Sequence, residues 1–224
     1  MLRLLSLALL CALSLAQTPT YDILIAGGRI VDGAGNPWFV GDVGIQGDII
    51  AYVGPAGHSR GRLTLDAKGL VVAPGFIDTH SHARRGIFES PAAENQIRQG
   101  VTTLIEGPDG SSPLPLKPFL EKLAATQFSV NFGTLVGQGS IREKVIGLKD
   151  RKATPEEIAA MRELTRQAML EGAFGLSTGL FYLPGIFTPT EEVIEIAKVA
   201  GVMGGIHTGL PTQITHHKIM GRSN

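Results

Sequence analysis

The stretch Val71-Val72-Ala73-Pro74-Gly75-Phe76-Ile77-Asp78-Thr79-His80-Ser81-His82 decides how the rest of the chain is interpreted. An apolar run ends here in two histidines one residue apart. Side chains of a strand alternate between its two faces, so His80 and His82 are expected on the same side. Two imidazoles at the end of one strand can bind a single metal ion, although two ordinary surface histidines would show the same spacing.

Downstream of this stretch, predicted strands alternate with predicted helices. The strands cover residues 70–78, 101–106, 130–136, 174–177, 205–208 and 212–216, and the helices cover residues 91–99, 117–126, 154–171 and 188–202. Thr154 and Thr188 each precede a proline and stand three residues before a glutamate, which predicts two capping boxes. Repeated strand–helix units with apolar strands predict an α/β fold, a partial TIM-type (β/α) barrel with its chemistry at the C-terminal strand ends.

Three segments are therefore expected along the chain. Residues 1–16 combine one arginine, a short apolar core and a small-x-small site, which predicts a signal peptide and export to the periplasm or medium. Residues 17–69 contain short apolar strands and a Gly47-Asp48 hairpin signal, which predicts part of a small antiparallel β-sandwich. Residues 70–224 form the barrel portion.

The amino-acid composition limits the kinds of binding partner that we expect for this chain. The chain has 224 residues, of which 43% are hydrophobic, and its formal net charge is zero. That size allows one substantial core and a small second unit. Balanced charge gives no reason to expect nucleic acid or a membrane surface as a partner beyond export. The only cysteine, Cys11, lies in the predicted signal peptide, so the exported chain has no thiolate to offer a metal.

Polar side chains collect at the predicted strand ends. They are His80, His82, Glu106, Ser177, Thr178, Tyr182, His207, His216, His217 and Lys218. Imidazole and carboxylate are ligands that zinc accepts. A set of His80, His82, Glu106, His207 and His216 would suffice for two ions with the glutamate between them. Because a bound metal lowers the pKa of water, the predicted reaction is hydrolysis of an amide-like carbonyl by metal-activated hydroxide.

Four motifs, at residues 74–82, 99–103, 172–185 and 213–218, together resemble the N-acyl-D-amino-acid deacylase (D-aminoacylase) family of the amidohydrolase superfamily. The resemblance covers about residues 21–222. It implies a small-molecule N-acyl-D-amino acid as substrate and one or two divalent ions, zinc first among them. It also implies that His80 and His82 bind one ion, that His207 and His216 (rather than His217) bind the other, and that catalytic Tyr182 lies near the substrate carbonyl. A packing role at the barrel rim is the alternative for Tyr182.

The chain departs from the family pattern at the bridging ligand. Many members have a metal-bridging cysteine in an Asn-Cys-Gly context, where this chain reads Glu106-Gly107-Pro108-Asp109-Gly110. Either Glu106 or Asp109 would replace the thiolate, and Glu106 is favoured because it ends the predicted strand directly. A carboxylate bridge keeps zinc possible and also suits manganese or cobalt.

Two further departures concern length. Residues 208–215 are too few for the crossover of about a dozen residues that adjacent parallel strands need, so an internal shortening is expected near Thr208 and Gly209. The resemblance also implies two more strands and a general acid/base aspartate beyond Asn224, so we expect an incomplete version of the enzyme. The alternatives are a non-catalytic metal- or partner-binding remnant, or another amidohydrolase of the dihydropyrimidinase or isoaspartyl dipeptidase kind. These usually bridge metals with a carboxylated lysine on the fourth strand, and residues 173–180 contain no lysine.

Overall fold

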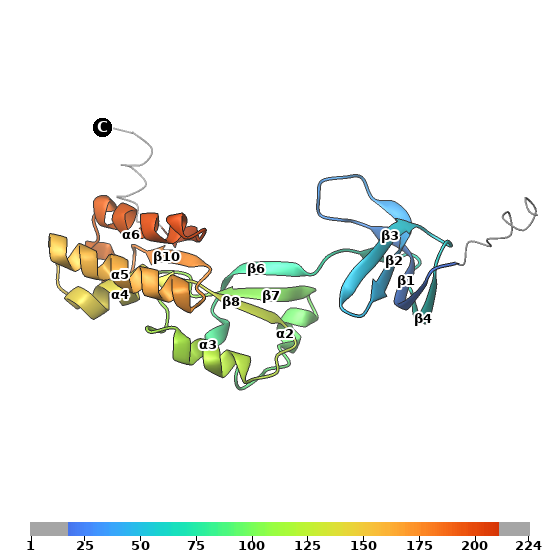
Figure 1. Ribbon diagram of the computed structural model, residues 1–224, viewed down its shortest axis with the longest axis horizontal. Coiled ribbons are helices and arrows are strands. Elements are labelled where there is room, and N and C mark those ends of the chain that lie inside the picture. Colours follow the sequence, from blue (N-terminus) through green and yellow to red (C-terminus); the bar gives the residue numbers. More distant parts are fainter. Residues whose placement is uncertain (1–17, 211–224) are drawn as a thin grey trace, which may run out of the picture. The chain divides into compact units, whose positions relative to one another are not determined.

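A computed structural model describes residues 18–210 of the chain. The chain divides into two compact units, residues 1–74 and residues 75–224 (Figure 1). The predicted signal peptide and the strand predicted at residues 212–216 lie outside the described residues and stay predictions. Within residues 18–210, no helix combines the length and the apolar character needed to cross a bilayer.

The first unit is a five-stranded sheet. Its strands are β1 (Thr20–Ile30), β2 (Phe39–Gln46), β3 (Ile49–Pro55), β4 (Arg60–Asp66) and β5 (Val71–Val72), in the order β3-β2-β1-β4 with β5 also pairing with β1. The predicted hairpin is confirmed, since Gln46 pairs with Ile49 and Gly47 takes a left-handed φ of 62° between them. The boundary between the units follows Pro74 rather than residue 69, because β5 still pairs with this sheet.

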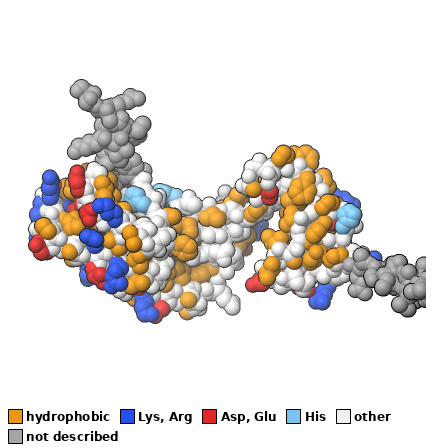
Figure 2. All heavy atoms as spheres, turned by 45° about the horizontal axis from the view of Figure 1, so that its top comes forward, with side chains coloured by type: hydrophobic (Ala, Val, Ile, Leu, Met, Phe, Trp, Pro, Cys, Tyr) orange, Lys and Arg blue, Asp and Glu red, His pale blue; other side chains and the backbone are white. Residues whose placement is uncertain are grey.

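The prediction of a purely antiparallel first unit is wrong. β1 and β2 are antiparallel, but β4 and β5 both run parallel to β1. The 11-residue β1 is long enough to pair with β4 along its first part and with β5 near its end. Many large apolar side chains of this unit are exposed, and Figure 2 shows them covering much of its visible face.

The second unit contains two parallel three-stranded sheets. One has the order β6-β7-β8 and the other β11-β10-β9. Their strands are β6 (Phe76–Ser81), β7 (Val101–Glu106), β8 (Asn131–Thr134), β9 (Val136–Gly137), β10 (Gly175–Gly179) and β11 (Ile206–Leu210). Only Leu135 separates β8 from β9, which belong to different sheets, and within each sheet the strands that follow one another along the chain pair in parallel. The predicted α/β class with parallel strands is confirmed.

Helices alternate with these strands. They are α2 (Glu94–Ile97), α3 (Lys117–Ala124), α4 (Gln138–Ile146), α5 (Pro155–Glu171) and α6 (Thr190–Val202), with 3₁₀ turns η1 (Ala83–Arg85) and η2 (Gly185–Phe187). Four of them correspond to predicted helices, but α2 is much shorter than residues 91–99. Helix α4 was not predicted, because two of its four buried residues are Gln138 and Arg142, which interrupt the apolar periodicity.

One predicted capping box is confirmed and the other is wrong. The Thr154 hydroxyl accepts a hydrogen bond from the Glu157 backbone N–H, and the Glu157 carboxylate accepts one from the Thr154 N–H. At α6 the capping residue is Pro189, and no side chain caps the helix. The Thr188 hydroxyl is engaged elsewhere, because it accepts a hydrogen bond of 2.9 Å from Gln138 Nε2.

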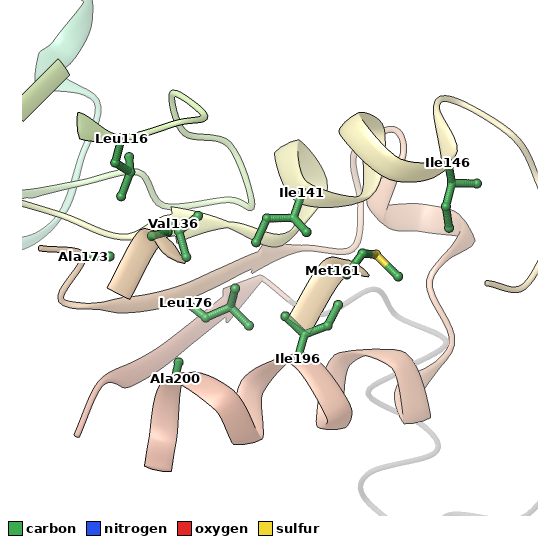
Figure 3. Packing of buried hydrophobic residues seen from close by; sticks show 10 residues of the cluster. Leu116, Val136, Ile141, Ile146, Met161, Ala173, Leu176, Ile196 and Ala200 are labelled. Atoms are coloured by element: carbon green, nitrogen blue, oxygen red, sulfur yellow. The ribbon is translucent and has the colours of Figure 1, made fainter. Parts of the chain in front are cut away.

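The main core of the second unit lies between the β11-β10-β9 sheet and the helices α4, α5 and α6 (Figure 3). Leu176 of β10, Ile141 of α4, Met161 of α5 and Ile196 of α6 are fully buried and point toward one another. A smaller cluster contains Leu104 of β7, in the β6-β7-β8 sheet, together with Ile87, Ala93 and Val130. The helices therefore hold β10 firmly in place, and β10 leads directly to the loop that carries Tyr182.

Candidate metal centre and its cavity

Three side chains meet at the C-terminal end of β6. His80 lies on that strand, His82 follows it directly, and Asp109 comes from the loop after β7. The Nε2 atoms of His80 and His82 lie 3.4 and 3.3 Å from the same oxygen, Asp109 Oδ2. One ligand atom from each residue lies within 4.8 Å of the other two, a spacing that allows all three to hold one metal ion. The predicted same-side placement of the two histidines is thus confirmed.

The backbone and the carboxylate of Asp109 are both unusual. Its φ of 60° places a non-glycine residue in the left-handed region, which is costly unless surrounding contacts enforce it. Its second oxygen, Oδ1, is buried and has no hydrogen-bond partner among the described residues. A carboxylate that faces two imidazoles and keeps one oxygen without a partner has a donor atom to offer a metal ion.

Glu106, the favoured carboxylate of the sequence prediction, lies apart from this group. It is fully buried, its Oε2 accepts a 3.0 Å hydrogen bond from the Arg84 backbone N–H, and its Oε1 lies 3.5 Å from Arg84 Nη1. The chain passes from Glu106 through Gly107, with a φ of 85°, before Asp109 reaches the histidines. The geometry therefore favours Asp109 over Glu106 as the carboxylate beside His80 and His82.

The ligands predicted for a second ion are only partly described. His207 lies on β11, and its Nε2 is 3.2 Å from the Thr178 hydroxyl at the end of β10. Partial burial lowers the pKa of the His207 imidazole, which favours the neutral form that binds metals. His207 is not part of the group formed by His80, His82 and Asp109. His216 lies outside the described residues, and its predicted role stays a prediction.

A cavity of about 440 Å³ opens beside the group. His82 and Asp109 line it, and so does Tyr182, whose loop follows β10 and whose side chain is about half exposed. The Tyr182 backbone N–H donates to the Gly179 carbonyl oxygen at 3.0 Å, which begins the turn into η2. The structure thus brings the tyrosine singled out by the sequence into one cavity with two members of the candidate metal group.

Two arginines also line this cavity, and the sequence prediction did not include them. They are Arg84 and Arg85 of η1, directly after the histidine pair. The guanidinium of Arg84 contacts Ser111 and Glu106, whereas no carboxylate of residues 18–210 lies within 4.0 Å of the Arg85 guanidinium. Their position immediately after His80 and His82 was the signal that could have placed them.

Ser177 has the spacing of a hydrolase nucleophile but not its setting. Gly175-Leu176-Ser177-Thr178-Gly179 matches the pattern Gly-x-Ser-x-Gly, whose serine normally sits on a sharp strand-to-helix turn. Here it lies inside β10 and is fully buried. Its hydroxyl donates to the Gly107 carbonyl oxygen at 2.5 Å and accepts from the Gly110 N–H at 3.1 Å. Ser177 therefore acts as a structural link to the loop of Asp109.

Comparison with known proteins places these observations in a family. Residues 63–200 match the model of the amidohydrolase family. D-aminoacylase of Alcaligenes xylosoxydans xylosoxydans is 34% identical over 259 residues, an alignment that covers 95% of this chain and 54% of the relative. A solved D-aminoacylase structure is 35% identical with a TM-score of 0.76, covering 84% of this chain and 44% of that one.

N-acyl-D-glutamate deacylase from Bordetella bronchiseptica, solved with zinc and a phosphonate mimic of the tetrahedral intermediate, is 32% identical with a TM-score of 0.78. That match covers 85% of this chain and 45% of the deacylase. The chain spans about half the length of the curated relatives it matches. The 259 aligned positions exceed the 224 residues of the chain, so the D-aminoacylase has internal residues without a counterpart here. With a family model over most of its length, the chain belongs to the amidohydrolase family.

Proposed function

We propose that this chain carries the first-metal site of a divalent-metal-dependent amidohydrolase that deacylates N-acyl-D-amino acids. The observation that supports this most is the convergence of His80 and His82 on one oxygen of Asp109, at the carboxyl end of parallel strands. The relatives named D-aminoacylase and N-acyl-D-glutamate deacylase support the choice of reaction. The parallel strands in chain order support a partial (β/α) barrel, in which the C-terminal strand ends carry the chemistry.

The residues fit a zinc ion. Two imidazoles and one carboxylate are a usual zinc donor set, and the unpartnered Asp109 Oδ1 leaves the carboxylate free to bind in more than one way. We assign His80, His82 and Asp109 to this ion and keep His207 and His216 as proposed ligands of a second. When bound, such an ion supplies a Lewis acid that polarises a carbonyl group and lowers the pKa of a water molecule.

The protein residues around the cavity would bind and orient the substrate. Tyr182 can donate a hydrogen bond from its hydroxyl to the substrate carbonyl oxygen, where negative charge develops during attack. Arg85 offers a cation to the carboxylate that every N-acyl-amino acid carries. A second cavity of about 810 Å³ also meets His82, and Ala83, Ile87 and Pro91 in its wall suit an acyl group.

Zinc binding by the purified chain tests the assignment. We expect His82→Ala and Asp109→Ala each to weaken zinc affinity by more than about 100-fold, since loss of groups that merely orient ligands already costs 10- to 100-fold. His58→Ala, which changes a histidine of the first unit, is the matched control and should bind zinc like the wild type. Zinc affinity that is unchanged in both site variants would refute the assignment.

Hydrolysis is tested separately with the zinc-loaded chain. Because the expected general acid/base aspartate lies beyond this chain, we expect slow release of free amino acid, and only from N-acetyl-D-amino acids rather than the L-enantiomers. Tyr182→Phe should then lower kcat by at least about tenfold, because it removes a hydrogen bond that strengthens in the transition state. Equal turnover of the D- and L-substrates would contradict the proposed substrate class.

A further inference from the structure

Arg84 joins two parts of the site that flank Asp109. Its backbone N–H donates to Glu106 Oε2 at 3.0 Å, at the end of β7. Its guanidinium donates from Nη1 to the Ser111 carbonyl oxygen at 2.8 Å and from Nη2 to the Ser111 hydroxyl at 2.9 Å. Since Glu106 precedes Asp109 and Ser111 follows it, one arginine spans the loop on both sides of the candidate ligand.

Glu106 fixes the position of Arg84 through a backbone hydrogen bond and an ion pair. The Glu106 side chain is completely buried and has no accessible surface. A buried carboxylate is unfavourable unless a cation compensates it, and the Arg84 guanidinium lies 3.5 Å from Glu106 Oε1. The residue favoured as a ligand from the sequence thus contacts Arg84, the arginine that reaches the loop.

Residues of β10 and α4 hold the other side of the loop formed by residues 107–112. Ser177 of β10 bonds both Gly107 and Gly110, and the Ser140 N–H of α4 donates to the Gly110 carbonyl oxygen at 3.1 Å. Gly179 of β10 is so close that a Cβ there would lie 2.0 Å from the Asp109 carbonyl oxygen. Contacts with β10 on one side and with Arg84 on the other thus fix the backbone of residues 107–112. These contacts explain how the left-handed conformation of Asp109 is maintained.

We propose that Arg84, paired with Glu106, is a positioning residue that holds residues 107–112 so that Asp109 faces His80 and His82. The consequence for metal affinity rests on the proposed function, whereas the effect on the loop does not. Arg84 binds no metal itself, and its contribution passes through the backbone on either side of Asp109.

Arg84→Lys is the informative variant. Lysine keeps a positive charge for Glu106 but cannot make the two parallel bonds to Ser111. We expect zinc affinity to fall by about 10- to 100-fold, the range found when groups that orient metal ligands are removed. In the metal-free protein, hydrogen exchange of the Gly110, Ser111 and Ser112 backbone amides, each of which donates a hydrogen bond, should accelerate, while that of helix α5 should not change.

Arg142→Lys is the matched control. Arg142 forms a buried ion pair with Glu192, and its guanidinium also donates to the Arg151 carbonyl oxygen, so its side-chain hydrogen bonds go to residues other than 107–112. It should lower the unfolding temperature at least as much as Arg84→Lys but change zinc affinity and loop exchange much less, because its helix reaches the loop only from the side of Ser140. An equal loss of zinc affinity in both variants would show general destabilisation and overturn the proposal.

The two proposals fail in different ways. If the wild type binds no zinc but Arg84→Lys accelerates loop exchange, the positioning role stands and the metal site does not. If the wild type binds zinc and Arg84→Lys matches it in both affinity and loop exchange, the positioning role is refuted and the metal site stands.

Discussion

Strand β10 is buried at all five of its positions, whereas β6 is buried only at Ser81. Both strands belong to parallel sheets of the same unit, but helices α4 and α6 pack on β10, while β6 carries the exposed His80 near its end and is followed by the exposed His82. The difference is chemical. Ligands that must meet a metal ion and a substrate need an open surface, and the neighbouring closed surface supplies the rigidity that keeps the loop of Asp109 in place.

The ion pair between the two helices on β10 is expected to contribute most to the stability of this closed region. Arg142 of α4 and Glu192 of α6 are both buried, and the Arg142 guanidinium donates to the Glu192 carboxylate. Arg142→Met leaves the buried Glu192 carboxylate without its cation, so we expect the free energy of unfolding to fall by about 3–5 kcal/mol. Urea denaturation measures this loss.

A double variant provides the control. In Arg142→Met/Glu192→Leu the uncompensated charge is gone, and most of the lost stability should return, because apolar replacements of a buried pair are often neutral. A double variant as unstable as the single one would mean that the pair acts through its shape rather than its charge.

The second test compares the two strands directly. Leu176→Ala on β10 removes a side chain with no exposed surface and should cost about 2–5 kcal/mol of unfolding free energy. Phe76→Ala on β6, where the ring is 61% exposed, should change it by no more than about 0.5 kcal/mol. If the two substitutions cost the same, the stability of this unit does not reside in the second sheet.

A smaller effect is expected on the stability of the protein at low pH. A hydrogen bond from Arg151, followed by one from the Thr154 N–H, lowers the pKa of the Glu157 carboxyl from 4.5 to about 2. Since the folded-state pKa is the lower one, this stabilisation is present above about pH 4.5 and is lost as the pH falls toward 2. Between these values the urea midpoint of the wild type should decline more steeply than that of Glu157→Gln. Parallel declines would show that this exposed pair adds nothing measurable.

Local patterns were sufficient for much of the fold. The bounds of β7 were predicted to the residue, the Gly47-Asp48 hairpin was correct, and the Thr154 capping box formed as expected. Each of these depends on residues close together in the chain, where side-chain period, turn chemistry and capping act directly. The pairing of His80 with His82 belongs to the same class, because alternation along one strand determines it.

Contacts distant in sequence decided the rest. Helix α4 escaped prediction because its buried Arg142 is compensated by Glu192, 50 residues away. Thr188 does not cap α6 because Gln138, also 50 residues distant, donates to its hydroxyl. No local pattern contains such partners, and a polar residue on a buried face or an occupied capping group can be recognised only once they are in place.

Residue patterns alone were enough to predict a parallel α/β unit with two histidines on one side of a strand end and a carboxylate from the following strand or loop. Which carboxylate faces the histidines depends on contacts that form only in the folded chain. Glu106 is held by Arg84, while Ser177, 70 residues after Gly107, grips the loop that turns Asp109 toward the histidines. The physical reason is that a strand determines the direction of its own side chains, but a loop takes its conformation from the neighbours that bind its backbone.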